Sequence, residues 1–231
     1  MTAAVKIDEK GRLVVNPDEV ARRLAKLEFS RCRIVACGWF AAFFFNATQR
    51  GRAIADWARL CESVAFAEKM TLARAQPAMP ELAGEATELE RAFRQARRGG
   101  PAMLSESELL LPAQASPDFK PERIKARLLE TYRAGGISVE PGFESLTDTL
   151  AAEFAFLQAM ILQESEEREQ ARFFFGHLRP LAHASAKTLE AARDALALAP
   201  VTAAMRRFLV AEEALFRGGF TGEAPSGQTL H

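Results

Sequence analysis

Residues 140–181 read EPGFESLTDTLAAEFAFLQAMILQESEEREQARFFFGHLRPL and decide the fold class. The segment starts with a Pro- and Gly-containing loop. From Leu146 to Ile161, apolar residues then recur at three- and four-residue steps, a spacing typical of one face of a helix. A charged break at 164–169 precedes a second helical pattern that runs to Leu181. Pro180 is expected to kink that second helix. The pattern predicts helices and no strands.

The rest of the chain repeats this helical pattern. Asn16 is placed to cap a helix, Pro17 suits its first position, and Glu19 completes the spacing of a capping box. Apolar residues then surround most of the segment 29–47, as expected of a central core helix. Gly51 is predicted to separate this helix from the next. Further helices are expected at 54–67, 81–98, from Pro121 to the Gly135-Gly136 stop, at 184–198, and after Pro200.

We therefore predict an all-α fold, a bundle of about nine to eleven helices in two lobes joined by a hinge loop. Residues 1–15 would form an N-terminal arm or a small hairpin. The N-terminal lobe would span 16–136, the hinge loop 137–147 and the C-terminal lobe 148–217, with a flexible tail at 218–231. One face of the helix after the hinge loop carries small side chains, which would let a neighbouring helix approach closely: Asp148, Ala152, Ala155 and Ala159.

Composition excludes several function classes. The 231 residues are 48% hydrophobic and 26% charged, with a formal net charge of zero, so the strong basic footprint of a nucleic-acid binder is missing. The longest apolar run, 34–45, is shorter than the ~20 residues that span a bilayer. The N-terminus lacks the apolar core of a secretory signal. We expect no nucleic-acid binding, no stable membrane insertion and a cytoplasmic location.

Residue types that carry catalysis are scarce. The histidines are His177, His183 and the terminal His231, and no His/Cys group has metal-ligand spacing. Neither a serine nucleophile elbow nor a phosphate-binding loop occurs. The three cysteines, Cys32, Cys37 and Cys61, lie in apolar helical contexts where thiols tend to be inert. We expect a protein that is not an enzyme and that holds no metal and no cofactor.

Short pieces between residues 120 and 215 carry a family resemblance. Glu140-Pro141 is followed, after a six-residue insertion, by Asp148 and an apolar helix. A second helix then carries Phe173 and the pair His177-Leu178. This order resembles TorD/NarJ-type chaperones, whose motif reads Glu-Pro-Asp-His, then an apolar helix, then Phe-x-x-x-His-Leu-x-x-Trp. The chain departs from it at Thr149, which replaces the motif His, and at Leu181, which replaces the Trp.

The resemblance implies a TorD-like helical fold and a chaperone role. Its partner would be the precursor of a molybdopterin-dependent oxidoreductase of the dimethyl-sulfoxide-reductase type. Such chaperones bind the twin-arginine signal peptide, the apoenzyme, or both, and they delay export until the cofactor is inserted. A hydrophobic groove and carboxylates would meet such a peptide. The hinge-like loop between the predicted lobes would allow a domain-swapped dimer, so both a monomer and such a dimer stay open.

Six residues are candidates for peptide binding: Glu140, Pro141, Asp148, Thr149, Glu153 and His177. For Asp148 the alternative is a helix cap, and for Glu140 a solvated side chain. Glu153 lies among apolar residues and needs a polar partner, so a structural hydrogen bond is the alternative. His177 is alternatively a packed, hydrogen-bonded core histidine. Two other functions stay open: a non-catalytic helical adaptor of another family, and an all-α enzyme with a small apolar substrate.

Overall fold

The computed structural model describes residues 5–7, 13–72, 76–82, 86–98, 104–110, 120–192 and 194–218. The predicted tail after Gly218, the turn at Lys10-Gly11 and most of the Pro-containing segment 101–120 lie outside these residues. Within them the body is all-helical, which confirms the predicted fold class. Two three-residue strands, β1 (Val5–Ile7) and β2 (Leu13–Val15), pair antiparallel ahead of the helices, as the hairpin alternative predicted.

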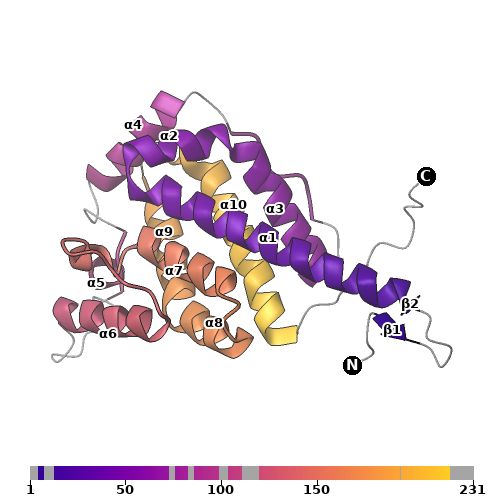
Figure 1. Ribbon diagram of the computed structural model, residues 1–231. Helices are drawn as coiled ribbons and strands as arrows, with labels where there is room; N and C mark the ends of the chain where they lie inside the picture. The colour runs from indigo at the N-terminus through magenta and orange to yellow at the C-terminus, as the bar shows by residue number, and fades with distance from the viewer. Residues whose placement is uncertain are drawn as a thin grey trace.

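The described residues of the first half contain four longer helices. They are α1 (Pro17–Phe45), α2 (Ala47–Ala55), α3 (Trp57–Thr71) and α4 (Ala86–Arg98). One turn, α5 (Glu106–Leu109), follows, and then α6 (Pro121–Ala134). The N-terminal turns of α1 project beyond the other helices towards β1 and β2 (Figure 1).

The second half begins with a short 3-10 turn, η2 (Glu144–Leu146), and continues through α7 (Leu150–Leu162) and α8 (Glu167–Phe173). A widened π-helical segment, η3 (Phe174–Leu178), leads into α9 (Arg179–Glu190), and α10 (Ala195–Gly218) ends the bundle. Pro180 has no N–H for the carbonyl four residues before it, and the widened turn lies where a kink was expected.

Local signals placed some helix ends correctly. The Asn16 side chain accepts hydrogen bonds from the backbone N–H groups of Asp18 and Glu19, at 3.1 and 3.3 Å. Gly136 adopts a positive φ of 74° just after α6, which suits a glycine stop.

Two other predicted boundaries were wrong. Gly51 lies inside α2, and the break before α2 falls at Asn46, whose side chain caps α2 by accepting from the Gln49 N–H at 2.9 Å. Pro200 lies inside α10 and does not precede the last helix.

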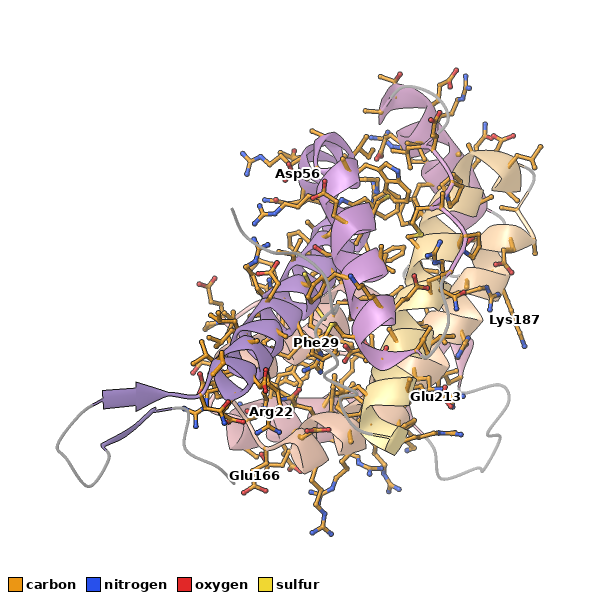
Figure 2. All side chains as sticks on the ribbon, turned by 90° about the vertical axis from the view of Figure 1, so that its right-hand side faces the viewer. Arg22, Phe29, Asp56, Glu166, Lys187 and Glu213 are labelled. Atoms are coloured by element: carbon orange, nitrogen blue, oxygen red, sulfur yellow. The ribbon has the colours of Figure 1, made fainter. Side chains whose placement is uncertain are left out.

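One continuous core joins the two halves. The longest helix, α1, packs most extensively against α7, and buried residues from both predicted lobes share this core. A smaller cluster forms where α1, α3 and α10 meet around Phe29 (Figure 2). The boundary of the two lobes stays a prediction, but α1 and α7 pack together across it.

Buried ion pairs and hydrogen bonds of two arginines hold helices of the bundle together. The guanidinium of Arg33 donates to both carboxylate oxygens of Glu212 at 2.7 Å and to Gln170 Oε1 at 2.9 Å. Arg50 donates to the Phe43 carbonyl at 2.8 Å and pairs with Glu90. Neither arginine is a solvated helix-end residue, because the fold supplies a buried acceptor to each guanidinium.

Candidate functional site

A short segment crosses the N-terminal end of α7. This segment, residues 104–110, contains α5 and is called the α5 strap here. Ser105 and Thr149 form an antiparallel bridge, and the Leu150 N–H donates to the Leu104 carbonyl at 2.8 Å. The Glu106 N–H donates to the Asp148 carbonyl at 2.9 Å. The strap therefore holds Glu106 against the start of α7.

Asp148 is fully buried under this strap. One carboxylate oxygen, Oδ2, accepts the Ser107 N–H at 3.2 Å. The other, Oδ1, has no hydrogen-bond partner among the described residues and lies 3.8 Å from Lys125 Nζ. Thr149, and not Asp148, caps α7, because its Oγ1 accepts the Ala152 N–H at 3.3 Å. Asp148 thus tethers the α5 strap to α7.

Glu153 lies one turn further along α7 and is completely buried. Its carboxyl shares a side-chain hydrogen bond with the carboxyl of Glu106, one of the causes of its raised pKa. No N–H or hydroxyl group among the described residues donates to its oxygens. Burial raises the pKa of Glu153 well above its usual value, and the neighbouring charges of Glu106 and Asp148 raise it further. We call Glu106, Asp148 and Glu153 the carboxyl cluster.

His177 joins the cluster from the other side. Its Nδ1 lies 2.9 Å from Glu106 Oε1, and its ring stacks on Phe173 with centroids 5.6 Å apart. The geometry fits the packed, hydrogen-bonded histidine that the sequence offered as an alternative to a peptide contact.

Tyr132 lies between the carboxyl cluster and the predicted hinge loop 137–147, which is called the linker from this point on. Its hydroxyl donates to the Thr147 carbonyl at 2.6 Å. Burial raises the pKa of Tyr132 well above its usual value, and the charges of Glu153, Glu106 and Asp148 add to the effect. The phenol therefore stays protonated and keeps its hydrogen bond to the linker.

An apolar groove of about 330 Å³ opens on the other side of Tyr132, between α1, the linker and α7. Two half-exposed aromatic side chains, Phe45 and Phe143, lie along it. Ala152 and Ala155 were expected to admit a neighbouring helix, and their small side chains line this groove instead. The lining residues are Ala41, Ala42, Phe45, Gln49, Tyr132, Val139, Phe143, Leu146, Thr147, Thr149, Ala151, Ala152 and Ala155.

The structure brings four of the six candidate residues together: Asp148, Thr149, Glu153 and His177. Glu140 and Pro141 are exposed in the linker, apart from the cluster's hydrogen bonds. Because the Asp148 and Glu153 side chains are buried, a peptide reaches them only if the surrounding segments move. Peptide binding by all six stays a prediction.

Sequence reasoning missed Glu106, which lies at the centre of the cluster. Its only signal is an acidic pair, Glu106 and Glu108, between Leu104 and Leu109. That pattern marks a short amphipathic turn and does not reveal a partner 71 residues away.

Among the described residues, no group of three or more His, Cys, Asp or Glu side chains has the arrangement of a metal site. The helices in that part of the chain also lack one that is both long and apolar enough to cross a bilayer.

Comparison with known protein families gives a match to most of the chain. The family model described as nitrate reductase delta subunit matches residues 55–199, which include the α5 strap, the linker, the carboxyl cluster and η3. No curated protein and no solved structure matches the chain.

Proposed function

The chain belongs to the nitrate reductase delta subunit family, whose members are chaperones of molybdoenzyme maturation, and from this premise we propose that it binds the N-terminal segment of its client's precursor. The client is a nitrate-reductase-type molybdoenzyme catalytic subunit of the dimethyl-sulfoxide-reductase class. The bound segment is its twin-arginine or related leader, held in the cytoplasm until the molybdenum cofactor is inserted. This role requires recognition and no catalysis.

The observation that carries the proposal is the apolar groove between α1, the linker and α7. Its lining is almost entirely apolar, and Phe45 and Phe143 leave nearly half of their surfaces exposed beside it. An amphipathic or apolar peptide segment buries its side chains in a surface of this kind. The groove also runs along the linker, which contains the peptide-binding candidates Glu140 and Pro141.

Isothermal titration calorimetry of the full chain with the N-terminal peptide of the nearest encoded molybdoenzyme tests the proposal. We expect micromolar or tighter binding with a negative heat-capacity change, because apolar surface is buried. Ala155→Glu places a charge in the groove and should weaken binding by about tenfold or more.

The matched control is Ala126→Glu, which introduces the same charge on an exposed face of α6. It should bind like the unmodified protein. If Ala155→Glu leaves the affinity unchanged, the groove is not the site. If neither the leader nor the apoenzyme binds, the chaperone role proposed here is wrong.

A further inference from the structure

The N-terminal end of α1 presents large apolar side chains to solvent. Leu24 and Leu27 are 61% and 66% exposed. They lie one turn apart on the part of α1 that projects beyond the other helices (Figure 1). Two exposed leucines on one helix face form an apolar patch that association with a partner would remove from water. We call Leu24 and Leu27 the leucine patch.

The same helix also carries one wall of the apolar groove. Ala41, Ala42 and Phe45 line the groove from α1. Positions 24, 27, 34, 41 and 45 follow the three- and four-residue spacing of a single helix face, and none of these five side chains is fully buried. With a rise of about 1.5 Å per residue, the leucine patch lies roughly 25 Å along α1 from the groove wall.

A two-fold axis across α1 would bring these two surfaces together. Ile34 lies midway between the leucine patch and the groove wall. If a second copy is related by an axis near Ile34, its α1 runs antiparallel to the first. Each leucine patch then meets the groove of the other copy, so one symmetry operation buries both surfaces twice. Arg31 lies near this axis, and its ion pair with Glu28 offsets its charge.

The charges beside the two surfaces are opposite. Residues 22–27, which include both leucines, contain three basic side chains and no acidic one. Glu19 pairs with two of them, at 2.9 and 3.1 Å, so positive charge remains on this turn. The linker beside the groove contains two acidic side chains, Glu140 and Glu144, and no basic one. Opposite charge favours the encounter of one copy's α1 end with the groove of another.

We propose that two copies of this chain associate through α1 about this two-fold axis, with Leu24 and Leu27 of each copy in the apolar groove of the other. Each chain keeps its own packing of α1 on α7, so no segment is exchanged as in a domain-swapped dimer. The dimer itself does not depend on the proposed function. Its consequence does: because the second copy covers the groove, it competes with the client's leader peptide.

Sedimentation velocity of the full chain over a series of concentrations tests the dimer. We expect a reversible equilibrium between monomer and dimer. The double variant Leu24→Glu, Leu27→Glu places two charges in the interface and should weaken association by about a hundredfold. Leu196→Glu, which changes a 90% exposed leucine on α10, is the matched control and should leave association unchanged. Circular dichroism confirms that each variant is folded.

A short bis-maleimide cross-linker tests the symmetry. Ile34→Cys places a thiol of each copy near the axis and should give a cross-linked dimer. Leu24→Cys is the control, because its two copies would be about 30 Å apart across the axis. The unmodified chain measures the background from its own cysteines, of which Cys61 is the most exposed.

A chain that stays monomeric at every concentration overturns the proposal. A dimer that persists in the double leucine variant, or that cross-links equally through residues 24 and 34, uses another surface and also overturns it. Addition of the client's leader peptide should convert the dimer to monomer. A dimer with the expected cross-link that the leader does not dissociate supports the interface and overturns the competition, which separates this inference from the proposed function.

Discussion

Two buried polar clusters in this protein differ in the partners of their charged side chains. At one, Arg33 on α1 spans Glu212 on α10 and Gln170 on α8, and Gln170 donates in turn to the Ser165 carbonyl at 2.8 Å. At the other, the carboxyl of Glu153 has acidic neighbours, Glu106 and Asp148, and its side-chain hydrogen bond is to Glu106. The first cluster is complete and acts as a structural clamp. The second brings acidic groups together and raises the pKa of Glu153, so its contribution to stability depends on pH.

The largest loss of stability is expected at the cluster around Arg33. Glu212→Gln leaves the Arg33 guanidinium buried without its charge partner and should lower the free energy of unfolding by about 3–5 kcal/mol. Urea denaturation followed by circular dichroism measures this. Glu190→Gln is the control, because its pair with Arg206 is exposed and should cost about 1 kcal/mol or less. Equal losses in both variants would contradict the clamp.

Glu153→Gln should raise the free energy of unfolding at neutral pH, whereas Glu212→Gln lowers it. Because the folded pKa of Glu153 lies above its unfolded value of about 4.5, the folded state binds more protons than the unfolded state between those two values. Stability therefore falls as pH rises through this window, by up to about 1.4 kcal/mol per pH unit. Glu153→Gln removes this dependence, so it should match the unmodified protein near pH 4.5 and exceed it in stability at higher pH.

Urea denaturation at a series of pH values makes that measurement, with Glu130→Gln as the control. Parallel curves for the unmodified protein and Glu153→Gln across pH 4.5–8 would show that the folded state does not shift the pKa of this carboxyl.

Tyr132→Phe should cost about 1–2 kcal/mol, because it leaves the buried Thr147 carbonyl without its donor. Thr131→Val on the same helix removes an exposed bond to the Arg127 carbonyl and should change stability by less than about 0.5 kcal/mol. Thermal unfolding of both variants provides the comparison. A Tyr132→Phe protein as stable as the Thr131→Val protein would mean that the hydroxyl does not hold the linker.

The smallest effect is expected at Gln170→Leu. This change removes the neutral arm of the clamp and keeps the Arg33–Glu212 pair, so a loss of about 1 kcal/mol is expected. Urea denaturation of this variant beside Glu212→Gln separates the neutral arm from the charged one. A loss as large as that of Glu212→Gln would show that Gln170 is essential to the clamp.

Features that depend on neighbouring residues, such as helix starts, helix stops and helix faces, could be predicted from the sequence. The Asn16-Pro17 start of α1, the Gly135-Gly136 stop and the helical face of α7 follow from capping and periodicity. The family also followed from short motifs around Asp148 and His177.

Long-range pairing was not accessible in the same way. Arg33 and Glu212 are 179 positions apart, and a single sequence contains no signal that joins them. Glu106 was missed for the same reason. The position of the groove could not be predicted, because small side chains such as Ala152 and Ala155 suit a covered helix face equally well. Only the fold shows that no helix among the described residues fills that space.

Photo-crosslinking tests the central claim most directly. A client N-terminal peptide with benzoylphenylalanine in its apolar segment is irradiated with the full chain, and the attached residues are identified by mass spectrometry. We predict attachment along the groove, at Phe45, Phe143 or Ala155. Attachment confined to the exposed side chains of Leu24 and Leu27 on the projecting end of α1 would contradict the account.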